Sequence, residues 1–376
     1  MNKLKLMTIV GTRPEIIRLS SVIKACDQYF DHILVHTGQN WDHSLSQVFF
    51  DDFALRKPDY FLEVAGDSLG ETMGAIIAKS YEVLARERPD ALLVLGDTNS
   101  ALSAIPAKRL KIPIFHMEAG NRCWDWNVPE MTNRTIVDHI ADINLPYTEN
   151  SRRYLLSEGI DGKTMFVTGS PMREVLRDME TKIEASTVLS DLGLTPREYI
   201  LLSAHREENI DDEAAFLSLM QAVNRIADKR GITVLYSVHP RSRKFIEQRG
   251  FEFHPLVQLH EPFGFCDYVK LQQNAYCVLS DSGTLSEEST MLGFPAVLIR
   301  TSTERPEALD AGTVVVGGIT GEDVEQAMDV AVGMADSGAE VGIVSDYEET
   351  AVSTKVVKVI QGYAKIVNLT TWRKST

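Results

Sequence analysis

The most informative segment of the chain places acidic and basic side chains directly after an apolar run. The run 112–115 is followed by Glu118 and Arg122 and then by Glu130 and Arg134. An apolar run of this length is typical of a buried parallel strand. Loops at the carboxyl ends of parallel strands are where open α/β sheets bind ligands and carry out chemistry. The segment therefore favours an enzyme over a protein that only binds a partner.

A third acid, Asp97, stands in the equivalent place after the preceding apolar run. An isolated aspartate at a strand end is most often a helix N-cap. Because Glu118 follows the next strand in the same way, the two carboxylates can face one pocket. Crowded carboxylates raise one another's pKa, which gives a protein a general acid or base near neutrality. Glu130 would complete the set, although its spacing from Arg134 also suits a surface ion pair.

The loop Gly11–Glu15, with the sequence GTRPE, has features of an anion site. Pro14 suits the first helical position, so neighbouring amides would sit at the positive end of a helix, and Arg13 would add a charged fork. The alternative for Glu15 is that it only favours the helix dipole. The loop is neither GxGxxG nor a P-loop, which argues against a nicotinamide dinucleotide or ATP.

In the second half of the chain, His205 and Arg206 follow an apolar run. This pair suits a diphosphate clamp or a proton donor to a leaving phosphate, whereas a lone histidine is more often structural. Both interpretations stay open at this point. The segment 303–307, which contains Arg305, is weaker evidence for a ligand contact.

A further loop, with the sequence SDSGT, opens a helix after residue 279. Thr284 and Glu287 match a capping box, which is a sufficient structural account of both. That account does not cover Ser282 and Gly283, which would let the backbone approach a phosphate. Glu288, one residue further on, could accept both hydroxyls of a ribose.

Composition narrows the class of protein. The 376 residues are 44% hydrophobic and carry a formal net charge of -15, which suits a globular protein of two domains and argues against a broad nucleic-acid footprint. The four cysteines show no CxxC and no metal-ligand spacing, so we expect free thiols in a reducing compartment. No run has the length of a membrane span, and the N-terminus lacks the pattern of a signal peptide. We therefore expect a cytoplasmic protein with no membrane or nucleic-acid partner.

Short apolar runs alternate with amphipathic stretches, which is the pattern of βα units. We predict an α/β protein of two Rossmann-like, doubly wound domains that face each other across a cleft. The domains are placed at 1–170 and 171–358, with a C-terminal helix at 359–376 that could return to the N-terminal domain. The predicted strands are 6–10, 33–36, 91–95, 112–115, 143–145, 165–167, 199–203, 234–238, 276–279 and 296–299, and two of the predicted helices are 71–86 and 349–367.

Together these residues resemble one family closely, the non-hydrolysing UDP-N-acetylglucosamine 2-epimerases, whose two-domain architecture is the GT-B fold. The matching pieces span almost the whole chain in the family's order, so the set is very specific. They are GTRPE (11–15), TGQ (37–39), GDT (96–98), HMEAG (116–120), PE with NR (129–134), TGSP (168–171), HREEN (205–209), DSG with EE (281–288) and TERPE (303–307).

The resemblance implies reversible inversion at C2 of a UDP-linked 2-acetamido sugar, by anti elimination of UDP to a 2-acetamidoglycal and re-addition of UDP after protonation on the other face. It implies that Asp97, Glu118 and Glu130 form the acid/base set, and that His205 with Arg13 stabilises the departing diphosphate. It implies a homodimer and neither a metal nor another cofactor. The other residues that it assigns to the UDP-sugar are Arg18, Arg134, Ser282, Gly283, Thr284, Glu288 and Arg305.

Departures from the most familiar members bear on the sugar. Those members usually carry an LRTGD-like stretch where this chain has Asn121–Trp126. With TGQN (37–40) and VFFDD (48–52), the chain looks more like the subgroup that forms UDP-N-acetyl-L-fucosamine from UDP-2-acetamido-2,6-dideoxy-L-talose, for capsule or O-antigen synthesis. A 6-deoxy sugar lacks a hydroxyl, so either Trp124 or Trp126 could make an apolar contact near C6, unless both only pack the loop.

Other functions compete with this prediction. The first alternative is a UDP-N-acetylglucosamine 2-epimerase that forms UDP-N-acetylmannosamine. A GT-B glycosyltransferase would share the fold but has no need for the three carboxylates, and a non-catalytic UDP-sugar binder could dispense with them. The family's usual TGQH, which contributes to an activating second UDP-sugar site, reads TGQN here, and the change at Asn40 argues against such activation.

Overall fold

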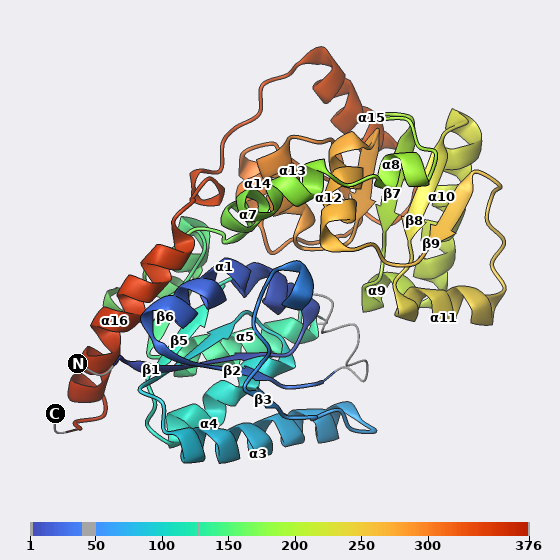
Figure 1. The fold of residues 1–376 in the computed structure, drawn as a ribbon. Coiled ribbons are helices and arrows are strands. Elements are labelled where there is room, and N and C mark those ends of the chain that lie inside the picture. The colour runs from blue at the N-terminus through green and yellow to red at the C-terminus, as the bar shows by residue number, and fades with distance from the viewer. Residues whose placement is uncertain (1–2, 40–49, 127, 375–376) are drawn as a thin grey trace. The chain divides into compact units, whose positions relative to one another are not determined.

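The computed structural model describes residues 3–39, 50–126 and 128–374 (Figure 1). The chain forms two compact units, each with its own parallel sheet, and each is described by itself. Unit 1 comprises Met1–Asp178 and Ser345–Thr376, and unit 2 comprises Met179–Val344.

Unit 1 is built on a six-stranded sheet with the order β3-β2-β1-β4-β5-β6, in which every neighbouring pair is parallel. This is the strand order of a Rossmann fold. The order in which successive strands are added reverses between β1 and β4. The strands read as near-continuous apolar runs because both faces are covered by helices. They are β1 (Lys5–Val10), β2 (Asp31–His36), β3 (Tyr60–Phe61), β4 (Ala91–Leu95), β5 (Ile114–Met117) and β6 (Ile143–Leu145).

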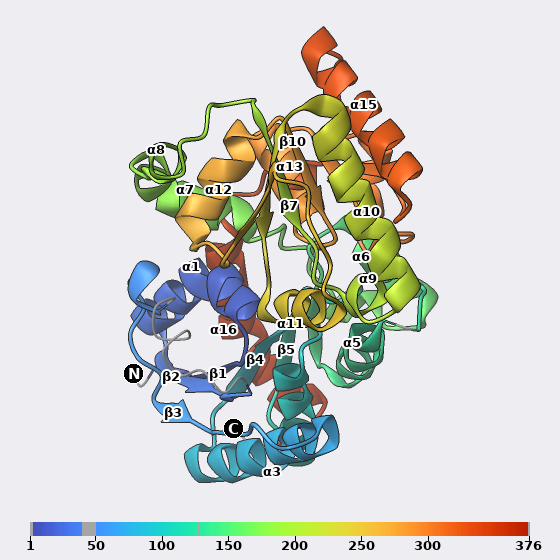
Figure 2. The ribbon, with the colours of Figure 1, turned by 90° about the vertical axis from the view of Figure 1, so that its right-hand side faces the viewer.

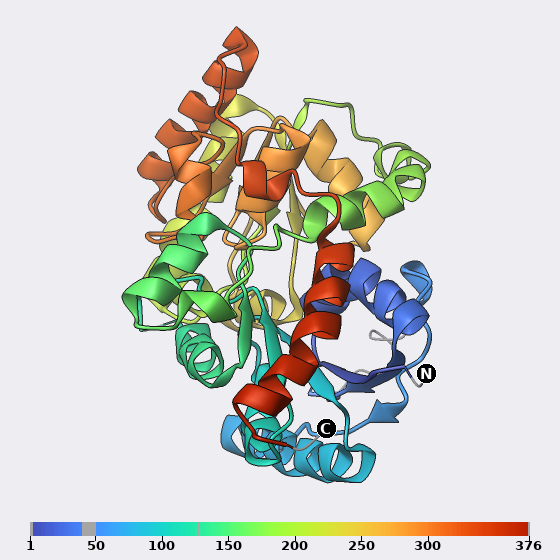
Figure 3. The same ribbon diagram turned by 90° about the vertical axis from the view of Figure 1, so that its left-hand side faces the viewer.

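The helices of unit 1 form two layers. On one side, α1 (Arg13–Tyr29) packs against α16 (Val352–Thr370), as Figure 3 shows. On the other side, α3 (Leu69–Glu87) and α4 (Ala104–Arg109) close an apolar core over the strands. The other helices that begin in this unit are α5 (Pro129–Ile140), α6 (Glu149–Ser157) and α7 (Met172–Glu184), with short 3-10 turns η1 (Asn99–Ser103), η2 (Gly162–Thr164) and η3 (Ser345–Tyr347).

Unit 2 repeats the arrangement, with the parallel order β12-β11-β10-β7-β8-β9. Its reversal point lies between β7 and β10. Figure 2 shows α10 and α15 on one side of the sheet, with α12 on the other, and each side has its own apolar core. The strands are β7 (Tyr199–Ser203), β8 (Thr233–Ser237), β9 (Val257–His260), β10 (Cys277–Ser280), β11 (Ala296–Leu298) and β12 (Val315–Val316). The helices are α8 (Val188–Asp191), α9 (Glu207–Ile210), α10 (Glu213–Arg230), α11 (Pro240–Arg249), α12 (Phe265–Asn274), α13 (Leu285–Leu292), α14 (Pro306–Asp310) and α15 (Gly321–Ser337).

The predicted fold class is confirmed, and one predicted strand is wrong. Residues 165–167 form a single bridge from Met165 to Asn144 instead of a strand, because β6 is short and Pro146, which ends it, has no amide to donate. Three short strands, β3, β9 and β12, went unpredicted. Each has exposed or half-exposed residues and lacks a long apolar run.

The unit boundaries fall within α7 and before Ser345, and so differ from those placed at 170 and 358. Contacts between the two segments of unit 1 explain the difference. The Ser170 amide donates to the Asp346 carbonyl at 3.1 Å, and Arg173 pairs with Glu348 at 3.1 Å. These contacts tie residues 170–173 to the returning C-terminal segment.

Two further findings concern the whole described chain. Its helices include none that is both long and apolar enough to cross a membrane. All four cysteines are free thiols.

Candidate active site

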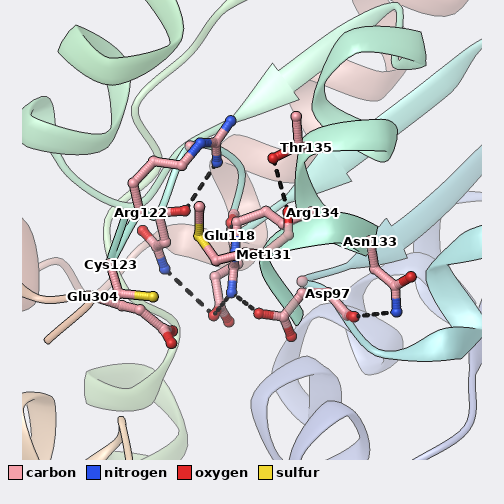
Figure 4. Close-up of polar contacts among 12 residues, drawn as sticks. Asp97, Glu118, Arg122, Cys123, Met131, Asn133, Arg134, Thr135 and Glu304 are labelled. Carbon is pink, nitrogen blue, oxygen red and sulfur yellow. Dashed lines mark hydrogen bonds and ion pairs between the residues drawn. The ribbon is translucent and has the colours of Figure 1, made fainter. Parts of the chain in front are cut away.

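The predicted acids of unit 1 follow strands at the reversal point of the sheet. Asp97 follows β4, and Glu118 follows the neighbouring strand β5. The side chain of Arg134, from α5, lies between them (Figure 4). Its Nη2 pairs with Asp97 Oδ2 and lies 3.4 Å from Glu118 Oε1. Its Nη1 donates to the Glu118 carbonyl at 2.6 Å.

A second arginine completes the pairing of Glu118. Arg18, on α1, pairs through Nη1 with Glu118 Oε2. Both guanidinium groups are buried, with 9% of the Arg18 side chain and 2% of the Arg134 side chain exposed. Arg134 therefore lies inside the unit and not at its surface. The buried carboxylate of Glu118 and the half-buried carboxylate of Asp97 are balanced by two buried cations, which makes the burial of these charges tolerable.

Helix α5 brings further polar groups to this site. Asn133 donates from Nδ2 to the Asp97 carbonyl at 3.0 Å and to Asn99 Oδ1 at 3.0 Å, as Figure 4 shows for Asp97. These bonds fix the loop that carries Asp97. Glu130 is half-buried in the first turn of the same helix. The sequence indicated Asn133 only as part of the NR motif. Its hydrogen bonds to the Asp97 loop were not predicted.

Glu15 has a different role from the one first considered. It is buried, and its carboxyl accepts from the Gly11 amide at 3.1 Å, from Thr12 Oγ1 at 2.7 Å and from Ser100 Oγ. It therefore joins the loop after β1 to the loop after β4. Burial raises the pKa of Glu15, despite these hydrogen bonds. Arg13 is exposed at the first position of α1.

In unit 2, the loops after β7 and β10 meet at one buried carboxylate, Asp281. Its Oδ2 accepts from the backbone amides of His205 at 2.8 Å and Arg206 at 2.9 Å, and from Asn209 Nδ2 at 3.0 Å. Its Oδ1 lies 3.2 Å from His205 Nδ1. A carboxylate only accepts hydrogen bonds, so this contact favours a proton on Nδ1 and leaves Nε2 for another partner. The His205 side chain is 38% exposed.

The loop after β10 places three predicted phosphate residues together. Ser282 Oγ lies 2.9 Å from Thr284 Oγ1 and accepts from the Thr284 amide at 3.4 Å. A Cβ added at Gly283 would lie 3.9 Å from Arg206 Nη2, so a guanidinium lies beside this glycine. Backbone amides, hydroxyls and an arginine before α13 form a suitable anion site.

The predicted capping box is wrong. The Thr284 side chain makes no cap hydrogen bond. Glu287 is instead fully buried and pairs through Oε1 with Arg305 Nε at 2.8 Å. Only 3% of the Arg305 side chain is exposed, and its guanidinium balances the charge of Glu287. Contact between Arg305 and UDP stays a prediction.

Glu288 is also buried, with 8% exposed, and its Oε2 accepts from Gln272 Nε2 at 2.6 Å. Gln272 was not predicted, because a glutamine in a helix gives no sequence signal of this kind. The structure thus brings together four predicted residues in unit 1, namely Asp97, Glu118, Arg18 and Arg134. In unit 2 it places four others in the loops at the carboxyl ends of β7 and β10, namely His205, Ser282, Gly283 and Thr284.

Some predictions cannot be placed. Residues 40–49 lie outside the described part of the chain, so Asn40 and the first two residues of VFFDD receive no structural account. Among the described residues, no group of three or more histidine, cysteine, aspartate or glutamate side chains has an arrangement that could hold a metal ion.

Comparison with known proteins matches the sequence and the fold of this chain to one group. The family model described as UDP-N-acetylglucosamine 2-epimerase matches residues 24–361. A solved UDP-N-acetylglucosamine 2-epimerase from Rickettsia bellii has 47% identity and a TM-score of 0.92, covering 99% of this chain and 100% of that chain.

Two other similar proteins carry more specific descriptions. The Methanocaldococcus jannaschii enzyme solved in complex with UDP-GlcNAc and UDP has 29% identity and a TM-score of 0.88, covering 96% of this chain and 100% of that one. The UDP-2,3-diacetamido-2,3-dideoxy-D-glucuronate 2-epimerase of Pseudomonas aeruginosa is 35% identical over 86% of this chain and 91% of its own length.

Proposed function

The chain belongs to the UDP-N-acetylglucosamine 2-epimerase family, and on that premise we propose its sugar, its product and the roles of its residues. It is an isomerase that binds a UDP-sugar. The proposed substrate is UDP-2-acetamido-2,6-dideoxy-L-talose, and the proposed product is UDP-N-acetyl-L-fucosamine for a surface polysaccharide. The similar proteins carry names for different sugars, so the choice of sugar rests on the residues of this chain.

The proposed reaction begins with cleavage of the bond between C1 and the UDP oxygen. The bonding electrons leave with UDP, and C1 becomes electron-poor, which makes the C2 proton acidic enough for a carboxylate to remove. A C1–C2 double bond results. A second carboxylate then protonates C2 on the opposite face, and the UDP oxygen attacks C1 again. Two acids and a group that stabilises diphosphate are therefore required.

One observation carries this proposal: Asp97 and Glu118 are held at adjacent strand ends by the same guanidinium, that of Arg134. A transferase or a simple binder does not require two acids fixed in this way by one buried arginine. We assign proton transfer to Asp97, Glu118 and Glu130, and leave open which acid serves which face. The arginine pairing keeps these acids oriented before substrate arrives, which is the preorganisation that catalysis needs.

We assign the leaving diphosphate to His205, Arg13 and the loop with Ser282, Gly283 and Thr284. Support comes from the Asp281 contact, which favours one tautomer of His205, and from the amides and hydroxyls that precede α13. An imidazole held in this way can donate a proton or a hydrogen bond to a phosphate oxygen. Glu288 is proposed as the ribose acceptor.

The sugar preference is proposed to come from the loop 121–126. Trp124 and Trp126 are 57% and 66% exposed, and Trp124 meets Tyr154 edge to face with ring centroids 5.5 Å apart. Exposed tryptophans are unusual without a partner, because burying such a ring is favourable. An apolar C6 methyl group would suit such a surface better than a hydroxyl would.

Proton NMR in D2O tests the proposal. The protein is incubated with UDP-2-acetamido-2,6-dideoxy-L-talose in one tube and with UDP-N-acetylglucosamine in another. Deuterium at C2 with inversion in the first tube alone is the expected result. Turnover in the second tube alone would replace the proposed substrate with UDP-N-acetylglucosamine. Exchange in neither tube would favour a transferase or a binder.

Replacement of the tryptophans tests the specificity loop. Trp124→Ala or Trp126→Ala should lower the preference for the 6-deoxy sugar by about tenfold, since an apolar contact to one carbon has this magnitude. Trp372→Ala is the control, because Trp372 follows α16 and lies against Lys108. The ratio of kcat/KM for the two sugars is the measurement. An unchanged ratio in both loop variants would remove these tryptophans from substrate recognition.

We also propose a homodimer located in the cytoplasm. Sedimentation analysis of the purified protein tests the assembly, and a monomer at the concentrations used for catalysis would contradict it.

A further inference from the structure

Glu118 has a backbone conformation that L-residues rarely adopt. Its φ is +59°, in the left-handed region, where a residue with a Cβ is strained. The Arg134 contact to its carbonyl, at 2.6 Å, supports this conformation from one side. Something must also hold the chain on either side of Glu118, because the strain would otherwise be released by a local change of the loop.

A single buried carboxylate, Asp138 on α5, contacts the chain two residues before and two residues after Glu118. Its Oδ1 lies 2.9 Å from Nδ1 of His116, at the end of β5. Both of its oxygens accept from the Gly120 amide at 3.2 Å. Gly120 has a φ of +83°, and a Cβ there would lie 2.5 Å from the Ser151 carbonyl, so the backbone fits closely at this point.

The same contacts reach the loop that carries Asp97. The Nε2 of His116 donates to the Gly96 carbonyl at 2.7 Å, so His116 connects Asp138 to the residue before Asp97. The loops that carry Asp97 and Glu118 are thus both connected to the carboxylate of Asp138 on α5. That helix also supplies Arg134 itself.

Asp138 is held in its charged form by its neighbours. Arg122 Nη2 lies 2.7 Å from Asp138 Oδ2, and Arg122 also pairs with Glu158 through two bonds of 2.8 and 2.7 Å. Burial alone would raise the pKa of Asp138, but the hydrogen bond from His116 and the charges of His116, Arg122 and Arg134 hold that pKa below its ordinary value.

We propose that Asp138 is a positioning residue for proton transfer at C2, which acts by holding Glu118 in its left-handed conformation and by fixing the Asp97 loop through His116. The inference rests on the proposed acid/base role of Glu118. It goes beyond that role because it assigns a function to a residue buried behind the site, with no exposed side-chain surface of its own. Small displacements of a catalytic group have large effects on rate, because proton transfer requires hydrogen-bond distance.

Asp138→Asn is the test, with Asp142→Asn as its matched control. Asp142 is also buried, and ties the start of β5 to the end of α5 by accepting from the Ile114 amide at 3.0 Å and pairing with Lys108 at 2.7 Å. It does not contact the Glu118 loop in any described interaction. We expect Asp138→Asn to lower kcat about a hundredfold with KM changed less than about threefold. Asp142→Asn should keep the wild-type kcat.

A double-mutant cycle separates positioning from a general structural effect. If Asp138 acts through Glu118, Asp138→Asn should lower turnover less in the Glu118→Gln background than in the wild type, because one of the two acids that it positions is already lost. Additive losses, or a folded Asp138→Asn variant with wild-type kcat, would overturn the proposal. If Glu118→Gln alone is fully active, the proposed role of Glu118 fails instead, and the positioning role fails with it.

Circular dichroism and thermal unfolding accompany each variant. If Asp138→Asn does not fold, His116→Gln replaces it, since this change removes one of the two contacts beside Glu118 and leaves Arg122 paired with Asp138. A loss of kcat at nearly constant KM is again expected. A folded His116→Gln variant with wild-type kcat would overturn the proposal.

Discussion

In each unit one buried aspartate contacts the loops that carry the predicted site residues, and on the proposed assignments the two aspartates serve different functions. In unit 1, Asp138 receives a histidine and a backbone amide, and lies next to a loop of acids paired with arginines. In unit 2, Asp281 receives two amides and a histidine, and lies next to a loop of amides and hydroxyls. On the proposed assignments, the same fold would serve proton transfer in one unit and anion binding in the other, according to what the aspartate holds in place.

The difference lies in where charge is balanced. Asp97 and Glu118 already have cationic partners within unit 1, so they are oriented with their charges compensated. His205 is 38% exposed and keeps Nε2 for another partner, which suits a phosphate that arrives with the substrate. The acids of the proposed proton-transfer site are thus paired within unit 1, whereas His205 of the proposed anion site is partly exposed.

The largest effect that would sharpen this comparison is expected at Asp281. Asp281→Asn removes the charge that fixes the His205 tautomer, and by analogy with other His–Asp pairs we expect kcat to fall about a thousandfold. Asn209→Ala is the control, because Asn209 contacts Asp281 Oδ2 without touching the imidazole. Nitrogen NMR of His205 should show proton on Nδ1 in the wild type and a changed tautomer in Asp281→Asn. An unchanged tautomer and kcat would break the parallel with Asp138.

A second pair of variants separates structure from binding within unit 2. Glu287→Gln leaves Arg305 buried without its anion and should lower the free energy of unfolding by about 3 kcal/mol, with UDP affinity unchanged in the folded protein. Glu288→Gln should show the reverse, a loss of UDP affinity of about tenfold with little loss of stability. Urea unfolding and calorimetric titration with UDP measure the two quantities. A large loss of UDP affinity in Glu287→Gln would instead support the prediction that Arg305 contacts UDP.

The smallest effect expected is a difference in pH dependence between two buried acids of unit 1. Burial raises the pKa of Glu15 above 4.5, so the folded state retains a proton that the unfolded state releases, and stability falls as pH rises from about 4.5 toward the raised value. The pKa of Asp138 lies below 3.8 in the folded state, so its contribution is present above about pH 3.8 and is lost as pH falls through the folded value.

Thermal unfolding from about pH 3 to about pH 8 checks both signs. Glu15→Gln should flatten the decline on the alkaline side, and Asp138→Asn should flatten the loss on the acid side. If Glu15→Gln declines as steeply as the wild type, burial of Glu15 is not the source of that slope.

The fold was predictable because each long strand is a continuous apolar run. The run 91–95 matches β4 at both ends, and the acids after β4 and β5 follow from strand position alone. Asp138 was not predictable, because an aspartate within an amphipathic helix looks the same whether it faces water or a buried histidine. The Thr284–Glu287 spacing predicted a cap, but Arg305, eighteen residues away in the chain, takes Glu287 instead. Local patterns cannot contain such long-range pairs.

The most direct test of the division between the two units is deuterium exchange at C2 in Glu118→Gln, measured by proton NMR in D2O beside UDP binding by calorimetry. The account predicts that exchange falls about a thousandfold while UDP affinity stays within about threefold of the wild type. Exchange at the wild-type rate in the folded variant would contradict the assignment of proton transfer to the acids of unit 1.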